Sequence, residues 1–369
     1  MRPTAEDSPH VLYLCLQVTI EGQASYAHVH EIIGGLREEG MRVDLFEPAY
    51  TSANPGALTR LREFLRAQRR LAAHLGEADV VYCRAHFADF PTAWRARRAG
   101  IPVVQEVNGP YEDLFVAWPW TRWASGIFTG LMRTQYRWAN ELVTVTDGLA
   151  RWLTEETGHA SVHVIPNGAN VEIFRPDAPR RNGLPPRYAV FFGALAAWQG
   201  IDVALNAVAL PEWPDDVSLV IAGAGACQAA VETAAVSNPR VVYLGTLPYR
   251  EIPGLVAGAL CGLSPKTGAG RSTSGLSPLK VYETLACGTP VIVTDFPGQA
   301  ELVRDNHVGA VVPPEDPAAL ASAIRALAAH EAERAAMGAR GRDLIVNAHS
   351  WRARARATGD VIREAIARA

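Results

Sequence analysis

The chain has 369 residues, a formal net charge of −3 and five scattered cysteines, and about half of its residues are apolar. This length allows two domains of ordinary size, each with its own core. The weak negative charge excludes the basic surface of a nucleic-acid-binding protein, the cysteine spacing excludes a zinc or redox motif, and the polar N-terminus without a long apolar run predicts a cytoplasmic protein.

Short apolar runs alternate with amphipathic helical stretches along the first half of the chain. Their β-branched and aromatic residues, bounded by Gly or Pro, are typical of buried parallel strands. Alternating strands and helices predict a doubly wound sheet, which binds ligands where the carboxyl ends of its strands meet. We expect six strands here: Val11–Val18, Arg42–Phe46, Asp79–Arg84, Pro102–Val107, Glu141–Thr146 and Val162–Ile165.

The loop after the first strand is a candidate ligand contact. Gly22 allows a ligand to approach the backbone closely, just before the next helix begins. An ordinary strand–helix turn explains this glycine equally well. His28 and His30 follow on the helix, where we expect solvated or core histidines rather than ligands.

Polar residues also end the third and fourth strands. Arg84 ends the third strand, and Glu106 and Asn108 lie at the end of the fourth. A charged Glu106 in a buried strand is costly unless it is paired, so we expect an ion pair with Arg84 on the neighbouring strand. That pair is consistent with a functional site and with a purely structural role.

Residues 114–138 are rich in aromatic side chains. Such a stripe is usually part of a core. It is also consistent with an acceptor pocket or with a patch for a membrane surface.

The second half of the chain repeats the alternation of strands and helices. The polar segment 175–187, rich in Pro and Arg, separates the two halves and is interpreted as a linker between domains 1–174 and 188–349, with a last helix over 350–369. The strands expected in the second half are Tyr188–Phe192, Val217–Ala222, Val241–Leu244, Leu260–Ser264, Val291–Asp295 and Ala310–Val312.

Residues 273–295 combine a loop, a capped helix, a tight turn and a buried strand. Ser277 suits an N-cap and Pro278 the first helical position. The free N–H groups at such a helix start form an anion site, and Lys280 in the first turn would suit a phosphate. Glu283, on roughly the same face, can accept bonds from two hydroxyls. The segment therefore offers what a nucleoside diphosphate requires, although similar helices without ligands are common in α/β folds.

This segment resembles the donor-site motif of family-4 glycosyltransferases, which are retaining enzymes with the GT-B fold. Glu283 matches the second of two motif glutamates, and the first would fall on Gly275. A subset of the family carries the S-P-L-K-x-Y-E pattern found here. The resemblance covers nearly the whole chain and implies two doubly wound, Rossmann-like domains facing a cleft. It also implies that the helix 350–369 packs back on the first domain.

The resemblance implies roles for residues of the first domain. Gly22 is similar to a family glycine that lies near the donor phosphates and the acceptor. Asn108 stands where the family places a polar residue that touches the sugar, and Glu106 would support it. With Arg84, these residues form the candidate catalytic group on this side.

The resemblance also implies how the second domain binds the donor. Gly193 and Gly200 match a family loop whose usual arginine and lysine bind the phosphates, but those positions hold Ala194 and Gln199. Either Lys280 helps to replace the missing cations, together with Arg271 or Lys266 from the loop before it, or the phosphate site is weak.

Further donor contacts are expected from the turns of the second domain. Gly223 follows a strand without the complete dinucleotide fingerprint, so we interpret it as a turn near the base. Leu247 would pack on the base ring. Gly275, Leu276 and Ser277 would line the phosphates before the helix.

The implied activity is transfer of a sugar from a nucleotide diphosphate sugar to an acceptor hydroxyl, with no separate cofactor and no metal. The acceptor is a natural product, a glycan or a lipid-linked molecule, and the last would require peripheral membrane contact. Nucleic acid is not an expected partner. Two alternatives remain: a nucleotide-sugar epimerase, and a catalytically weak nucleotide-sugar-binding protein. A periplasmic-type binding protein is disfavoured by the polar N-terminus.

Overall fold

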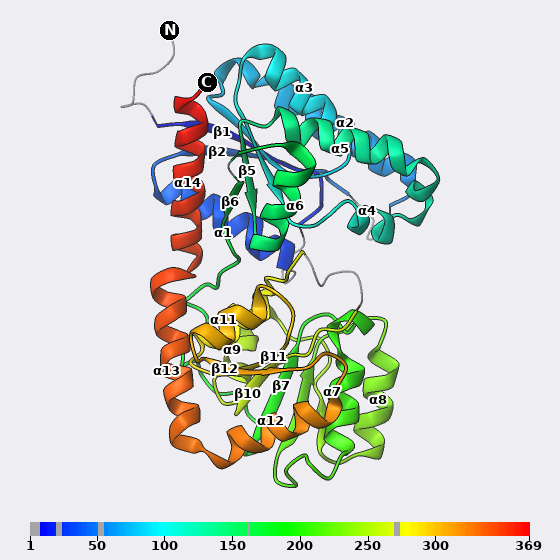
Figure 1. The fold of residues 1–369 in the computed structure, drawn as a ribbon, viewed down its shortest axis with the longest axis vertical. Coiled ribbons are helices and arrows are strands. Elements are labelled where there is room, and N and C mark those ends of the chain that lie inside the picture. The colour runs from blue at the N-terminus through cyan, green and yellow to red at the C-terminus, as the bar shows by residue number, and fades with distance from the viewer. Residues whose placement is uncertain (1–7, 20–23, 51–54, 161, 269–273) are drawn as a thin grey trace. The chain divides into compact units, whose positions relative to one another are not determined.

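The computed structural model describes residues 8–19, 24–50, 55–160, 162–268 and 274–369 (Figure 1). The contacts of the chain divide it into two compact units. Unit 1 comprises residues 1–166 and 354–369, and unit 2 comprises residues 167–353. Each unit holds one six-stranded sheet whose neighbouring strands are all parallel, which confirms the prediction of two doubly wound sheets.

The sheet of unit 1 has the strand order β2-β1-β3-β4-β5-β6. All six predicted strands are present, but β1 ends at Cys15 instead of Val18. Cys15 pairs with Arg84, the last residue of β3, so the chain beyond it has no neighbouring strand to bond. The bounds are His10–Cys15 for β1, Arg42–Phe46 for β2, Val80–Arg84 for β3, Val103–Val107 for β4, Glu141–Thr144 for β5 and Val162–Val164 for β6.

Helices cover both faces of this sheet. On one face Leu12 and Leu14 of β1 pack with Phe64 and Leu71 of α2, because alternate residues of a strand share a face. The end of the chain also belongs to this unit, where Arg368 Nη1 donates to Glu141 Oε1 at 2.7 Å. The helices are α1 Ala24–Glu38, α2 Ala57–Ala73, α3 Phe90–Ala99, α4 Glu112–Ala117, α5 Ser125–Trp138 and α6 Asp147–Thr157, with 3₁₀ turns at Leu75–Glu77 and Pro119–Ala124.

The sheet of unit 2 has the order β12-β11-β10-β7-β8-β9, and again every predicted strand is present. Alternation along β7 separates the two cores of the unit: Ala189 and Phe191 face one, while Tyr188 and Val190 face the other. The strands are β7 Tyr188–Phe192, β8 Ser218–Ala222, β9 Val241–Tyr243, β10 Cys261–Ser264, β11 Val291–Thr294 and β12 Gly309–Val312. The helices of unit 2 are α7 Ile201–Ala209, α8 Gln228–Ser237, α9 Ile252–Val256, α10 Leu279–Ala286, α11 Gln299–Asp305, α12 Pro317–Ala329 and α13 Glu331–Ala348, with 3₁₀ turns at Ala197–Gln199 and Tyr249–Glu251. The last helix, α14 Trp351–Ala367, begins in unit 2 and belongs to unit 1 from residue 354 onward.

Each sheet has one point where the strand order reverses. In unit 1 it lies between β1 and β3, and in unit 2 between β7 and β10. The connections that leave the two strands there run in opposite directions and open a crevice at the carboxyl ends. Ligand-binding residues are therefore expected beyond the ends of these strands.

Candidate active site

Glu106 is the centre of a buried polar cluster at the switch point of unit 1. Its carboxylate is 3.6 Å from Arg84 Nη1, which confirms the predicted ion pair, and it accepts bonds from the hydroxyls of Tyr82 at 2.8 Å and Tyr13 at 3.4 Å. These residues come together because Tyr13 pairs with Tyr82, and Arg84 with Glu106, in the register of the parallel strands.

His28 and Asn108 contact the same carboxylate. His28 is buried and its Nε2 lies 2.9 Å from Glu106 Oε1, so it is a core histidine, as expected, with a carboxylate partner that the sequence did not indicate. Burial alone would raise the pKa of Glu106, but His28, Arg84 and the amide of Asn108 hold it well below its usual range. Asn108 Oδ1 has no hydrogen-bond partner among the described residues. It therefore retains an acceptor for a ligand hydroxyl. Gly22 lies outside the described residues.

In unit 2, the carboxyl ends of β7 and β8 approach so closely that only glycine fits. A Cβ atom on Gly223 would lie 1.9 Å from Gly193 O, and one on Gly225 would lie 2.5 Å from Leu195 O. Gly193 and Gly223 also have positive φ values, 111° and 141°. The two predicted turns therefore pack directly against each other at the strand ends.

The start of α10 differs from the prediction. The helix begins at Leu279 with Pro278 as its N-cap, whose ψ of 127° is extended, so Ser277 does not cap it. The Ser277 hydroxyl instead accepts from the backbone N–H of Asn167 at 3.0 Å and contacts the Tyr282 hydroxyl at 2.9 Å.

In the loop before α10, one backbone N–H group that could have bound a ligand is already bonded within the protein. The N–H of Leu276 donates to Pro297 O at 2.7 Å, so this donor has a backbone partner. Gly275 has a positive φ of 76°, which suits glycine.

Lys280 occupies the first turn of α10 and points back toward the end of β7. Its ammonium lies 3.9 Å from the centroid of the Phe191 ring and would lie 3.8 Å from a Cβ on Gly193. Nζ is buried without a hydrogen-bond partner among the described residues. Burial lowers the pKa of Lys280 to about 7, and Glu283 opposes this shift. A buried cation that lacks a hydrogen-bond acceptor fits an anionic ligand at Gly193.

Glu283 lies one turn further along α10. Burial raises its pKa to about 7, opposed by a hydrogen bond from the Tyr249 hydroxyl and by Lys280. Sequence reasoning missed Tyr249, which comes from a 3₁₀ turn after β9. The predicted base contact, Leu247, is half-buried in the same connection.

Gln199 and Lys266 meet at the switch point of this sheet. Lys266 Nζ donates to Gln199 Oε1 at 2.7 Å and lies 4.1 Å from the centroid of the Trp198 ring. Both side chains are buried. Lys266 and Lys280 are the only lysines in the chain, whose other basic side chains besides histidine are all arginines. The use of lysine at these two positions, and of arginine everywhere else, is a pattern by which the sequence alone marks this site.

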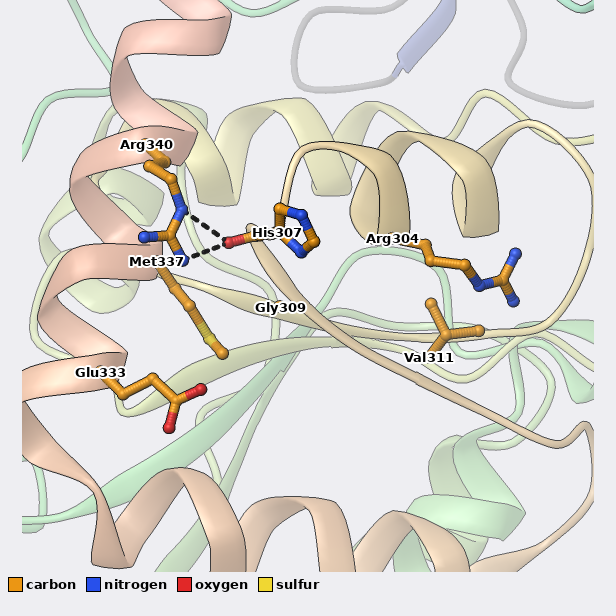
Figure 2. Close-up of a pocket in the computed structure, with 7 residues that line it drawn as sticks. All are labelled: Arg304, His307, Gly309, Val311, Glu333, Met337 and Arg340. Carbon is orange, nitrogen blue, oxygen red and sulfur yellow. Dashed lines mark hydrogen bonds between the residues drawn. The ribbon is translucent and has the colours of Figure 1, made fainter.

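Two other polar groupings lie away from these strand ends. Glu141, His163 and Glu364 in unit 1 place their ligand atoms within 4.8 Å of one another, and Arg368 bonds both carboxylates. A cavity of about 570 Å³ lies among α11, β12 and α13 of unit 2. Figure 2 shows the side chains that line it. Its lining residues are Arg304, His307, Gly309, Val311, Glu333, Met337 and Arg340. No predicted site residue lines it, and Arg340 is already bonded to His307 O.

The aromatic stripe of residues 114–138 is divided between core and surface. Met132 and Tyr136 are buried, whereas Trp123 and Ile127 are largely exposed. Leu58, Leu61 and Leu65 of the neighbouring α2 are exposed as well, and Arg60 of α2 lies 4.6 Å from the centroid of the Trp118 ring. No described helix combines the length and the apolar character that crossing a membrane requires.

Comparison with known proteins matches each half of the chain to a glycosyltransferase family model. The family model described as Glycosyltransferase Family 4 matches residues 27–173, and the model described as Glycosyl transferases group 1 matches residues 186–330. A phosphatidyl-myo-inositol mannosyltransferase of Mycobacterium leprae is 26% identical over 347 residues, which are 88% of this chain and 88% of that protein. These matches do not favour the epimerase or the binding protein.

Solved structures show the same fold. The sucrose-phosphate synthase from Thermosynechococcus elongatus has a TM-score of 0.80 at 18% identity, and the match covers 98% of this chain and 100% of that one. Anabaena HepE in complex with UDP and glucose has a TM-score of 0.71 at 16% identity, covering 96% and 99%. The predicted GT-B fold is confirmed.

Proposed function

Because the chain is a glycosyltransferase with the GT-B fold, built from a family 4 domain and a group 1 domain, we propose that it moves a sugar from a nucleotide diphosphate sugar to an acceptor hydroxyl. The observation that carries this proposal is the buried Lys280 ammonium beside Gly193, with Glu283 one turn away. A buried ammonium suits a diphosphate, and a carboxylate suits ribose hydroxyls.

The reaction that we propose retains the anomeric configuration. The bond between the anomeric carbon and the leaving phosphate oxygen breaks, and the acceptor oxygen bonds to the same face of that carbon. In this mechanism the acceptor proton passes to the leaving phosphate oxygen, which acts as the base. Positive groups at the phosphates stabilise the charge that develops on the leaving group, which lowers the barrier. Lys280 is the residue that we assign to this task.

The test is a panel of nucleotide sugars with different bases and sugars, assayed for nucleoside diphosphate release with and without phosphatidylinositol as acceptor. Transfer should exceed hydrolysis for at least one donor, and proton NMR of the product should show the anomeric configuration of the donor. Binding without turnover would favour the nucleotide-sugar-binding protein, and conversion of the donor sugar alone would favour the epimerase. Inversion of configuration would refute the proposed mechanism.

We also propose that the acceptor is presented at a membrane surface. The exposed face of α2 aligns Leu58, Leu61 and Leu65 at helical spacing. The same helix exposes four arginines, one of which, Arg66, pairs with the single acidic residue of the helix, the buried Glu63. Such a face suits an anionic lipid surface, because apolar side chains insert while arginines meet the headgroups. The exposed arginines are Arg62, Arg66, Arg69 and Arg70.

Co-sedimentation with vesicles tests the membrane proposal. The protein should bind vesicles that contain phosphatidylglycerol more strongly than vesicles of phosphatidylcholine alone. Replacing Leu58, Leu61 and Leu65 by Ser should abolish this binding. A matched control is Val236→Ser, an exposed apolar residue of α8 in unit 2, which should leave it unchanged. Equal binding by wild type and the triple variant would exclude this surface.

A further inference from the structure

Glu47 directly follows β2 and belongs to a row of residues that crosses the strand ends of unit 1. The register of β1 and β2 brings Glu47 beside Cys15, the last residue of β1. Cys15 pairs with Arg84, and Arg84 pairs with Glu106. Because residues that pair in a parallel sheet point to the same face, the side chain of Glu47 shares its face with those of Arg84 and Glu106.

The Cys15 thiol lies within electrostatic reach of both carboxylates. Burial raises its pKa to about 12, Arg84 opposes the shift, and Glu106 and Glu47 add to it. Coulomb interactions weaken with distance, so both glutamates must lie near this thiol. Glu47 is therefore part of the same edge of the sheet as the polar cluster around Glu106, where a doubly wound sheet binds ligands.

Two consecutive hydrogen bonds fix the carboxylate of Glu47. Thr19 Oγ1 donates to Glu47 Oε2 at 2.8 Å, and His30 Nε2 lies 3.1 Å from the same hydroxyl oxygen. A hydroxyl has one proton, which goes to Glu47, so it accepts from His30 and Nε2 carries the ring proton. The Tyr26 ring stacks on the imidazole with the centroids 4.0 Å apart. Thr19 and His30 are thus positioning residues for Glu47.

The second carboxylate oxygen of Glu47 is available to a ligand. Oε1 has no hydrogen bond to any residue that the structure describes, and the side chain is half-buried. Such an oxygen accepts charge-assisted hydrogen bonds from hydroxyl groups. Arg70 Nη2 donates to the backbone oxygen of Glu47 at 2.7 Å. This neighbouring positive charge disfavours an ammonium group at the carboxylate, which leaves a neutral hydroxyl as the better ligand.

We propose that Glu47, held by Thr19 and His30, binds a hydroxyl of the acceptor other than the one that reacts, and that the acceptor is a polyhydroxylated molecule such as a sugar or a cyclitol. Three strand spacings of about 4.8 Å separate Glu47 from Glu106 along the row, so the bound hydroxyl is remote from Asn108. Glu47 selects the acceptor without contacting the reacting atoms. This inference rests on the proposed function and names its substrate class.

A purely structural role for Glu47 predicts different behaviour. In that case the bond from Thr19 only closes the end of β2. Glu47→Gln would then lower the free energy of unfolding and leave polyol binding unchanged. A role in acceptor binding predicts that a folded variant binds polyols more weakly and nucleoside diphosphates as well as the wild type does.

The experiment measures binding of myo-inositol, methyl α-glucopyranoside and cyclohexylamine by saturation-transfer NMR, without a donor. At least one polyol should bind more tightly than the amine. Glu47→Gln should raise the Kd of that polyol about tenfold or more, as expected for a lost charged hydrogen bond. The matched control is Asp44→Asn, which removes a carboxylate of β2 that is bonded to His10 and should leave the polyol Kd unchanged.

Thr19 is tested through its effect on Glu47. Thr19→Val should raise the polyol Kd in the wild-type background but add nothing in the Glu47→Gln background, because Thr19 acts only through the carboxylate. Thr19→Ser keeps the hydroxyl and should retain affinity. With any acceptor that the protein glycosylates, Glu47→Gln should raise the acceptor KM and leave kcat unchanged.

Four results would overturn the inference: a wild type that binds neither polyol, an unchanged polyol Kd in folded Glu47→Gln, additive losses from Thr19→Val and Glu47→Gln, or tighter binding of cyclohexylamine than of the polyols. These measurements omit the donor, so they can be told apart from a failure of the proposed function. A protein that binds polyols through Glu47 but transfers no sugar would refute the transfer reaction and leave the polyol site in place.

Discussion

The Lys280 ammonium faces the Phe191 ring, 3.9 Å from its centroid, at the strand end that Gly193 completes. This contact stabilises a buried positive charge only weakly, so an anionic ligand should improve it strongly. Lys280→Met should therefore weaken nucleoside diphosphate binding far more than nucleoside binding. Titration calorimetry of both ligands measures this, and equal losses would show that Lys280 does not meet the phosphates.

Diphosphate binding should also take up a proton at pH 8. The pKa of Lys280 is lowered to about 7, so the side chain is mostly neutral at that pH and a bound anion recharges it. The observed binding enthalpy should therefore vary with the ionisation enthalpy of the buffer, with a slope that approaches one proton. The slope should fall in Lys280→Met, and an unchanged slope would contradict the assignment.

Glu283→Gln should raise the Kd of the donor about tenfold or more, because a charged hydrogen bond contributes roughly 1.5–3 kcal/mol. The loss should appear equally with the nucleoside, since the ribose is common to both ligands. Tyr249→Phe is the matched control: it removes a neighbour of Glu283 but leaves the carboxylate. Unchanged affinity in a folded Glu283→Gln variant would exclude the ribose contact.

The pair of Lys280 and Glu283 should give unliganded unit 2 a stability minimum near pH 7. Burial raises the pKa of Glu283 from 4.5 to about 7, so the native state binds more protons than the unfolded state in that interval, and stability falls as pH rises. Burial lowers the pKa of Lys280 from 10.5 to about 7, so stability rises again above pH 7. Urea unfolding of wild type and of Lys280→Met/Glu283→Gln between pH 5 and 10 isolates this contribution. If the difference in the free energy of unfolding between the two proteins did not change with pH, the assigned pKa shifts would be contradicted.

Glu106→Gln should destabilise unit 1 by about 3–5 kcal/mol, because it leaves the buried charge of Arg84 without its counter-ion. Urea unfolding with hydrogen exchange of the β4 amides measures the change. Asp295→Asn is the comparison: its partner Arg304 is half exposed, and loss of such a surface pair costs about 0–1 kcal/mol. Equal effects of the two substitutions would show that Glu106 is not held as an anion.

Turnover should persist after exhaustive chelation and dialysis, since the buried Lys280 ammonium already supplies positive charge at the proposed diphosphate site. The cluster of Glu141, His163 and Glu364 offers ligand atoms, but Arg368 bonds both of its carboxylates. Activity that disappears and returns only with magnesium or manganese would contradict this expectation. Glu141→Gln would then test whether that cluster is the metal site.

The strands could be predicted from sequence because buried parallel strands form apolar runs that end at Gly or Pro, as Tyr188–Phe192 before Gly193 does. The Arg84–Glu106 pair could be predicted because a buried carboxylate requires a partner. The contact of His28 with Glu106 and that of Tyr249 with Glu283 could not be predicted, since each joins two elements that are distant in sequence. The start of α10 was missed because Pro is favoured at the first helical position, whereas the extended ψ of Pro278 makes it the cap.

The close contact of Gly223 with Gly193, and of Gly200 with Pro265, joins three strand ends into one body. A ligand part that displaces any one of these loops must displace the others. Occupancy of the base position and of the phosphate position should then be thermodynamically linked, and by reciprocity each half of the donor raises the affinity for the other by the same factor. Uridine or guanosine should tighten the binding of free pyrophosphate, and Gly200→Ala should change this cooperativity even though residue 200 is assigned no contact with either fragment.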